Sequence, residues 1–386
     1  MALDLRMARR GTVVLAAGGT GGHLFPAQAL GEELVKRGYV VHLMSDERAR
    51  AMGNRFPAAQ MHEVPSATLT LRRPWKLPGQ ALRLMKGLKA AQALLAQIAP
   101  SAIVGFGGYP SVPPLLAAAR MKLPICLHEQ NAVMGRANRL LARRATLIAS
   151  SFPEIANLAP ALKARVAMTG NPVREDVLRA ADRPYEAPAT DGEFRLLVFG
   201  GSQGAQFFSR LMPDVLKEMT SPVRRSLVLV QQCRPEDLDG MRRACDALGV
   251  RAELQPFFSD LPRRIAESHL VVCRSGATSV AELSVIGRPA ILVPLPHSID
   301  NDQLRNAEAF ARAGAGWLMR QEEFGPSDLA AVVTRLRYNR SELGRAAAAA
   351  RARAVPDAAV RLCDRLEVIM DGAASDTSIS FGAERT

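Results

Sequence analysis

Two stretches of the 386-residue chain decide its fold: Thr12-Val-Val-Leu-Ala-Ala-Gly-Gly-Thr-Gly-Gly-His23 and Phe194-Arg-Leu-Leu-Val-Phe-Gly-Gly-Ser-Gln-Gly204. In each, an apolar run of strand length leads into a glycine-rich segment. A helical pattern follows, from Pro26 to about Lys36 in the first stretch and on to about Glu218 in the second. A strand, glycines and a helix in this order open a βαβ unit, from which parallel sheets are built. Two such openings predict two similar α/β domains of the Rossmann type.

Short apolar runs alternate with helical patterns through the rest of both halves. The further predicted strands are Val40–Met44, Ala102–Val104, Ile125–His128, Leu227–Val230, Leu270–Cys273 and Ala290–Val293. Between the halves, residues 181–193 are rich in proline and acid and are typical of a linker. We therefore expect domains at 1–180 and 194–370, with a disordered tail at 371–386. One large doubly wound sheet is the alternative arrangement.

The composition is that of a globular protein with two or three domains, because 48% of the residues are apolar and 23% are charged. The five cysteines are scattered without C-x-x-C spacing, which indicates reduced thiols in a cytoplasmic protein and no zinc site. The first residues lack the apolar core of a signal peptide. No apolar run approaches the length needed to span a bilayer.

Charge is distributed unequally along the chain. Residues 1–170 contain 22 Lys and Arg against 8 Asp and Glu, whereas the remainder contains 28 against 29. No acidic residue occurs between Glu63 and Glu129, although eight basic residues lie there. This asymmetry predicts that the first half meets an anionic partner: a phosphorylated substrate, an anionic lipid surface or nucleic acid.

The glycine loops are suited to binding phosphate, because they let backbone N–H groups approach an anion at the start of a helix. Neither loop has the spacing of a Walker loop or of a dinucleotide-binding fingerprint. The second loop also fits the Gly-x-Ser-x-Gly elbow of serine hydrolases around Ser202. Asp260 with His269 or His297 would complete that triad, so a hydrolase remains an alternative.

Polar residues follow several predicted strands, at the edge where open α/β sheets bind ligands. His23, directly after the first glycine loop, is a candidate general base because an ordinary imidazole titrates near neutral pH. His128-Glu-Gln-Asn131 follows another strand. In the second half, Glu282 lies where a carboxylate could accept hydrogen bonds from a ribose, and Asp300-Asn-Asp-Gln303 adds a polar cluster.

Taken together, these segments resemble the MurG family of bacterial N-acetylglucosaminyltransferases. The resemblance runs in order from about residue 11 to residue 370. It is carried by Gly18–His23, Gly107-Gly-Tyr109, His128–Asn131, Gly170-Asn-Pro-Val-Arg174, Gly200–Gly204, Cys273-Arg-Ser-Gly-Ala277 with Glu282, and Gln303 with Asn306-Ala307. One departure is Asp302, where the family often has Gln or His.

The resemblance implies the two-domain GT-B glycosyltransferase fold, with a cleft between the halves. It also implies inverting transfer of N-acetylglucosamine from UDP-N-acetylglucosamine to the 4-hydroxyl of the muramyl sugar in undecaprenyl-pyrophosphoryl-MurNAc-pentapeptide (lipid I), giving lipid II for peptidoglycan synthesis. No metal or other cofactor is expected, since helix N-termini and an arginine can stabilise the leaving UDP. Asp300-Asn-Asp302 has the spacing of a metal-binding motif but is interpreted as polar rim.

By the same resemblance, His23 is the candidate catalytic base. Glu282 would hold the ribose hydroxyls, the backbone at Phe258 would bind the uracil edge, and Asn131 and Gln303 would bind the sugar. The remaining residues expected around the donor are Thr20, Gly21, Gly22, Arg174, Ser202, Ala277, Thr278, Ser279, Val280 and Ala281.

The acid-free segment interleaves apolar and basic residues around 69–95, which is typical of a surface that lies on anionic lipid. The residues predicted to face the membrane are Arg72, Arg73, Trp75, Lys76, Arg83 and Lys86. The expected location is the cytoplasmic face of the inner membrane. An ordinary amphipathic helix is the simpler alternative. A non-catalytic protein that binds membrane or nucleic acid is a third, although the segment lacks interleaved aromatic residues.

Overall fold

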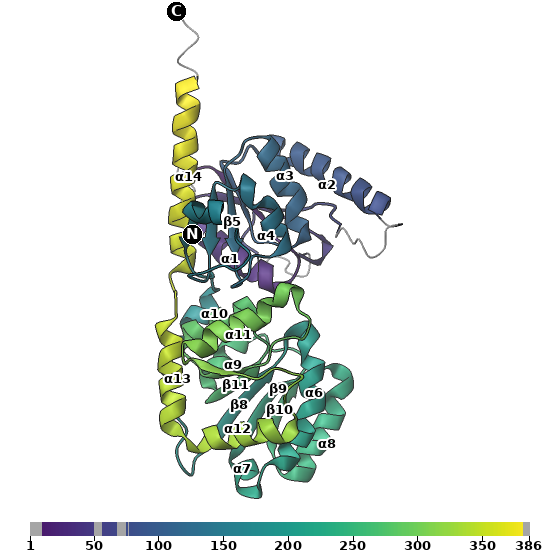
Figure 1. Cartoon of the computed structure of the whole chain (residues 1–386), viewed down its shortest axis with the longest axis vertical. Helices are drawn as coiled ribbons and strands as arrows, with labels where there is room; N and C mark the ends of the chain where they lie inside the picture. The colour runs from purple at the N-terminus through teal and green to yellow at the C-terminus, as the bar shows by residue number, and fades with distance from the viewer. Residues whose placement is uncertain (1–9, 50–55, 68–74, 76, 381–386) are drawn as a thin grey trace, which may run out of the picture. The chain divides into compact units, whose positions relative to one another are not determined.

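The computed structural model describes residues 10–49, 56–67, 75 and 77–380 (Figure 1). Contacts divide the chain into two compact units. The first comprises Met1–Arg174 together with Pro356–Thr386, and the second comprises Glu175–Val355. Within the described residues, each unit is built on one parallel sheet with helices on its faces. The prediction of two Rossmann-like α/β units is therefore confirmed.

The first unit contains seven strands among its described residues, in the order β3-β2-β1-β4-β5-β6-β7. The strands are β1 (Thr12–Ala16), β2 (Val40–Ser45), β3 (Gln60–Glu63), β4 (Ala102–Gly105), β5 (Ile125–Glu129), β6 (Leu147–Ser150) and β7 (Val166–Met168). The helices are α1 (Gly21–Lys36), α2 (Leu77–Ile98), α3 (Val112–Arg120), α4 (Arg136–Leu141) and α14 (Ala358–Ser380).

The second unit contains six strands among its described residues, in the order β10-β9-β8-β11-β12-β13. These are β8 (Phe194–Phe199), β9 (Leu227–Gln232), β10 (Arg251–Gln255), β11 (Leu270–Cys273), β12 (Ala290–Leu292) and β13 (Gly316–Leu318). The helices are α5 (Glu175–Ala180), α6 (Gly201–Glu218), α7 (Ser221–Ser226), α8 (Leu238–Leu248), α9 (Leu261–Glu267), α10 (Ala277–Ile286), α11 (Asp302–Arg312), α12 (Pro326–Tyr338) and α13 (Arg340–Ala352).

The opening strand of each unit is apolar because helices cover both faces of its sheet. Val13 and Leu15 of β1 pack into one core cluster, and Val14 and Ala16 pack into another. All four side chains are fully buried. Strands of parallel sheets have this uninterrupted apolar character, which is why the sequence located them.

Helix α1 begins at Gly21, earlier than the predicted start at Pro26. The N–H groups of His23 and Leu24 already donate to the carbonyl of Thr20, at 3.0 and 2.9 Å. The helix therefore begins inside the glycine loop, and its first residues belong to the candidate site.

The chain returns to the first unit from Pro356 onward. From the sequence, this segment up to residue 370 was instead expected in the second domain. Leu362 and Leu366 of α14 are fully buried in the same cluster as Leu30 and Leu34 of α1. Helix α14 also continues to Ser380, into the stretch that was expected to be a disordered tail. The chain returns here because the apolar residues of α14 up to Met370 pack beside α1 in the core of the first unit (Figure 1).

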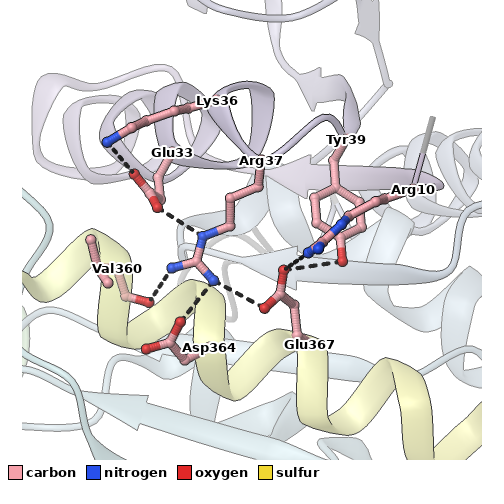
Figure 2. Close-up of polar contacts among 8 residues, drawn as sticks. All are labelled: Arg10, Glu33, Lys36, Arg37, Tyr39, Val360, Asp364 and Glu367. Atoms are coloured by element: carbon pink, nitrogen blue, oxygen red, sulfur yellow. Dashed lines mark hydrogen bonds and ion pairs between the residues drawn. The ribbon is translucent and has the colours of Figure 1, made fainter. Parts of the chain in front are cut away.

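Polar contacts reinforce this packing of α14 on the first unit (Figure 2). The Arg37 guanidinium donates to Glu33 at 2.8 Å, to Glu367 at 3.0 Å and to the Val360 carbonyl at 3.3 Å. It also pairs with Asp364 at 2.7 Å. Burial alone would lower the pKa of Arg37, but its acidic partners raise it, so the cation is stabilised where it stands.

The expected linker is attached to the second unit by two buried arginines. Arg288 donates to the carbonyls of Arg183 and Pro184 at 3.0 and 3.2 Å, and also to the carbonyl of Ala266. Arg337 likewise donates to three carbonyls, those of Ala189, Thr190 and Gly192. Both side chains are only 2% exposed. Residues 181–193 are therefore part of the second unit, which begins at Glu175.

Replacing Arg288 with methionine should destabilise the protein by about 2–4 kcal/mol, because it leaves several buried carbonyls without donors. Chemical unfolding followed by circular dichroism measures this loss. The exposed Arg345→Met variant is the control and should lie within about 0.5 kcal/mol of the parent. Equal stability of the two variants would contradict the anchoring role of Arg288.

Candidate active site

The residues predicted to bind substrates follow the carboxyl ends of strands in both units. Thr20, Gly21, Gly22, Asn131 and Arg174 belong to the first unit. Ser202, Phe258, Ala277–Glu282 and Gln303 belong to the second. We describe the two groups separately.

His23 lies in the first turn of α1 against two glycine segments. Its Nδ1 is 2.9 Å from the Thr20 hydroxyl. A methyl group added at Gly107 would lie 3.6 Å from His23 Nε2, and one added at Gly108 would lie 3.1 Å from the Gly18 Cα. Gly107 and Gly108 also have positive φ angles of 83° and 75°. Backbone conformation therefore favours glycine at both positions, and at Gly108 the close approach to the Gly18 backbone favours it as well.

The pKa of His23 is lowered to about 4, chiefly by burial and secondly by the nearby Arg48 cation. The imidazole is thus neutral at physiological pH and can accept a proton. It is, however, a weaker base than the ordinary imidazole that the sequence analysis assumed. If Nδ1–H donates to the Thr20 hydroxyl, Nε2 carries the free lone pair.

The residues after β5 build a second part of the first-unit site. The Glu129 carboxylate accepts from the backbone N–H of Asn131 at 3.0 Å and of Gly135 at 2.9 Å, and from Asn138 Nδ2 at 2.8 Å. The same Asn138 Nδ2 would lie 3.6 Å from a methyl group at Gly107. The buried Glu129 therefore fixes the Asn131 loop beside the glycine segments.

Arg174 lies against α1, next to the first glycine loop. Its guanidinium carbon is 4.2 Å from the centre of the Phe25 ring, which is two positions after His23. A cation over an aromatic face at this distance holds the charge in a defined place. The first unit thus brings Thr20, His23 and Arg174 to one end of α1.

In the second unit, the N-terminus of α10 is arranged to receive an anion. Gly276 precedes the helix and supplies no side-chain cap, so no side chain at that position accepts from the N–H groups of Thr278 and Ser279. The Val280 N–H already donates to the Gly276 carbonyl at 3.0 Å. The buried Thr278 hydroxyl has no hydrogen-bond partner in the structure. Glu282 lies on the next turn and is only 4% exposed.

Three side chains fix the loops around α10. The Ser275 hydroxyl donates to the Gln303 carbonyl at 2.8 Å, and Asn306 Nδ2 donates to the Ser275 carbonyl at 3.1 Å. Gln303 Oε1 accepts from the backbone N–H of Leu295 at 3.0 Å. The Gln303 amide is thereby oriented, with its NH₂ group still able to donate to a ligand.

Arg274 is a residue of this site to which the sequence analysis gave no role. Its buried guanidinium donates to the carbonyls of Val293 and Pro294 at 3.2 and 2.9 Å, and to Gln321 Oε1 at 2.6 Å. Burial lowers its pKa to about 10, so it keeps its charge at neutral pH. Its position directly after β11 was the sequence signal that could have identified it as a site residue. Its hydrogen bonds indicate that it holds neighbouring loops in place.

The second glycine loop opens α6, whose first residues include Ser202. The Ser202 side chain lies outside the described part of the structure. Phe258, in the loop after β10, is 5% exposed and lies beneath the Arg264 guanidinium at 4.2 Å from the ring centre.

The placement of Asp260 and His269 does not support the hydrolase triad that would use them. His269 precedes β11 and accepts from the backbone N–H of Arg195 at 2.9 Å, at the start of β8. Ser202 follows the other end of β8. Asp260 pairs with Arg264 at 2.7 Å. A triad of Ser202, Asp260 and His269 is therefore not assembled.

The predicted membrane-facing residues are only partly described. Trp75 is 73% exposed, and Arg83 and Lys86 are exposed on α2. Two apolar residues of α2 beside them, Leu82 and Met85, are 51% and 57% exposed. Arg72, Arg73 and Lys76 lie outside the described residues.

Comparison with known proteins establishes the family. The glycosyltransferase family 28 N-terminal domain matches residues 13–150, and the glycosyltransferase family 28 C-terminal domain matches residues 195–362. A Sinorhizobium fredii protein is 50% identical over 94% of this chain and 96% of its own. Its name is UDP-N-acetylglucosamine–N-acetylmuramyl-(pentapeptide) pyrophosphoryl-undecaprenol N-acetylglucosamine transferase. The chain belongs to the MurG family of glycosyltransferases.

Solved structures agree with this assignment. The crystal structure of Acinetobacter baumannii MurG aligns with a TM-score of 0.73 and 28% identity, covering 92% of this chain and 99% of that one. The kitacinnamycin glycosyltransferase, 18% identical, aligns with a TM-score of 0.69 over 94% of this chain and all of its own, and shows the fold alone. The predicted GT-B fold is confirmed.

His23→Ala should lower turnover by about 10²–10⁴-fold while changing the KM for the donor little, because a general base acts on the reacting hydroxyl. Steady-state kinetics with varied donor measure both quantities. His62→Ala, at a half-buried histidine of β3 to which no catalytic role is assigned, is the matched control. Turnover near the parent value would exclude His23 as the base.

The lowered pKa of His23 also predicts the pH dependence of the reaction. With a pKa of about 4, the imidazole is unprotonated down to about pH 5, so kcat/KM should not fall between pH 7.5 and 5.5 on account of this group. A pH–rate profile of the parent checks this. An acid limb with an apparent pKa near 6.5 that disappears in His23→Ala would contradict the effect of burial.

Glu282→Gln should raise the KM for the donor by roughly 10–100-fold with a smaller effect on kcat, because it removes a charged acceptor from the proposed ribose contact. Glu322→Gln, at an exposed glutamate, is the control. An unchanged donor KM would remove Glu282 from the nucleotide site.

Proposed function

We propose that this chain transfers N-acetylglucosamine from UDP-N-acetylglucosamine to the muramyl 4-hydroxyl of lipid I, with inversion, and so forms lipid II for peptidoglycan synthesis. The observation that carries this proposal is the 50% identity, over nearly the whole chain, to a transferase named for that reaction. The paired glycine loops and the buried Glu282 support it, because a diphosphate and a ribose require such groups.

We assign donor binding chiefly to the second unit. The diphosphate would meet the N-terminus of α10 and the second glycine loop, where backbone N–H groups can bind the charge of UDP. Glu282 would accept hydrogen bonds from the ribose, and the backbone at Phe258 would bind the uracil edge. Gln303, with its oriented amide, would bind the sugar.

We assign acceptor activation to the first unit. The attacking 4-hydroxyl would lose its proton to His23 Nε2 as it bonds to the anomeric carbon on the face opposite UDP. Thr20 would hold the ring through Nδ1, while Gly21 and Gly22 would leave room for the acceptor. Asn131, fixed by Glu129, would contact the donor sugar, and Arg174 would stabilise the charge that develops on UDP.

The transfer itself is tested with radiolabelled UDP-N-acetylglucosamine and a short-chain analogue of lipid I. We expect label to appear in the acceptor, in a β linkage by nuclear magnetic resonance. Labelled sugar appearing only as free N-acetylglucosamine would contradict a transferase. Covalent labelling of Ser202 by a fluorophosphonate would favour the hydrolase.

We further propose that the protein binds the cytoplasmic face of the inner membrane through the start of α2. The exposed Trp75, Leu82 and Met85, interleaved with Arg83 and Lys86, have the composition of a surface that enters the interface of anionic lipid. Arg72, Arg73 and Lys76 would extend this surface. Among the described residues, no helix has the length and apolar character to cross a bilayer. We propose no role in nucleic-acid binding.

The double variant Arg83→Glu/Lys86→Glu should bind anionic vesicles at least about tenfold more weakly, since each cation near such a surface contributes about 1 kcal/mol. Vesicle co-sedimentation measures binding. Activity on a short-chain soluble acceptor should be retained. The control reverses Arg225 and Arg243, two exposed arginines of the second unit. Equal weakening by both double variants would contradict a membrane surface on α2.

A further inference from the structure

One side chain, that of Gln232, joins two loops of the second unit. Gln232 is the last residue of β9. Its Oε1 accepts from the backbone N–H groups of Gly200 and Gly201, at 3.3 and 3.0 Å. Its Nε2 donates to the carbonyl of Pro256 at 3.2 Å. The glycine loop before α6 and the loop after β10 are thus connected by a single carboxamide.

The glycine loop needs a constraint of this kind. Gly201 has a φ angle of 66°, in the left-handed region that glycine adopts with little strain. Helix α6 begins there with no side-chain cap at Gly200, so no local side chain accepts from the Gly201 N–H. Gln232, which comes from the neighbouring strand, supplies that acceptor and fixes the conformation in which the helix starts.

Both joined loops have a role in the proposed function, on which this inference rests. The glycine loop leads into Ser202 and would face the diphosphate. Pro256 lies two positions before Phe258, whose backbone would face the uracil. The relative position of the two loops therefore sets the distance between the sites for the base and for the diphosphate.

We propose that Gln232 is a positioning residue for the donor: it holds the phosphate loop and the base loop at the spacing of a nucleoside diphosphate. Glutamine is suited to this role because its carboxamide accepts at one loop and donates at the other. It is also neutral, so it adds no charge that would repel the diphosphate. A glutamate here would lose the donor to Pro256 and add a negative charge.

The test compares UDP with uridine, which lacks the diphosphate, in the full-length chain. In Gln232→Leu, we expect calorimetry to show UDP binding weakened about tenfold, the effect of roughly one net hydrogen bond, and uridine binding changed less than about threefold. The donor KM should rise while kcat changes little. Gln232→Glu should weaken UDP binding further and leave uridine binding similar to that of Gln232→Leu.

The matched control is Gln255→Leu. Gln255 is paired with Gln232 in register across β9 and β10. Its side chain, however, donates to Glu253 Oε1 at 3.0 Å and does not connect the two loops. It should bind UDP and uridine as the parent does. Circular dichroism and thermal unfolding establish that each variant is folded before binding is compared.

The outcomes separate this inference from the proposed function. If the parent binds UDP and Gln232→Leu binds UDP equally well or more tightly, the positioning role is overturned while the transferase stands. An equal loss of UDP and uridine affinity would also overturn it, because that result indicates damage to the base site alone. If the folded parent chain binds no UDP, that result contradicts the proposed function and, with it, the positioning role of Gln232.

Discussion

All strands of a parallel sheet end at the same edge, and this constraint determines where the candidate substrate-binding residues of the protein lie. At that edge the helices begin, and the first turn of a helix leaves backbone N–H groups without partners inside it. In both units the strand that opens the sheet is followed by glycines, which let another group approach the backbone closely. The fold therefore presents two edges where an anion or a polar substrate can replace missing hydrogen-bond partners.

The two edges are completed differently. In the first unit, glycine segments pack against the His23 imidazole, and burial, together with the Arg48 cation, lowers the pKa of His23 to about 4. In the second unit, polar side chains fix segments that would otherwise have to become ordered when a ligand binds. Arg274, Ser275 and Gln232 each bond to main-chain groups of a neighbouring loop. Prior ordering of this kind lowers the entropic cost of binding a nucleotide sugar.

Much of the fold could be predicted because its signals are local. The apolar runs of β1 and β8 and the glycines after them report strand, turn and helix without reference to the rest of the chain. The family motifs located His23, Glu282 and Gln303 at strand ends or helix starts for the same reason. Short edge strands such as β3 and β13 carry a weaker pattern and were not predicted.

The features that the sequence did not reveal depend on distant partners. The sequence of α14 predicts an amphipathic helix but does not indicate which unit the helix packs against. The Arg37–Glu367 pair that helps to fix it joins residues 330 positions apart in the chain. Residues 181–193 have the composition of a linker, and only the structure shows Arg288 and Arg337 buried against them. His23 was recognised, but the burial that weakens it as a base was not visible. Glu129 belonged to a polar cluster expected to face a ligand, and only the structure shows that its oxygens hold the Asn131 loop.

We propose that this chain binds a uridine diphosphate sugar through backbone N–H groups and side chains without a metal ion. Calorimetric titration of the folded, full-length protein with UDP in buffer containing EDTA tests it most directly. We predict a binding heat that saturates at one UDP per chain and is retained in EDTA. The absence of any binding heat from a folded sample, or a heat that appears only when a divalent cation is added, would contradict the account.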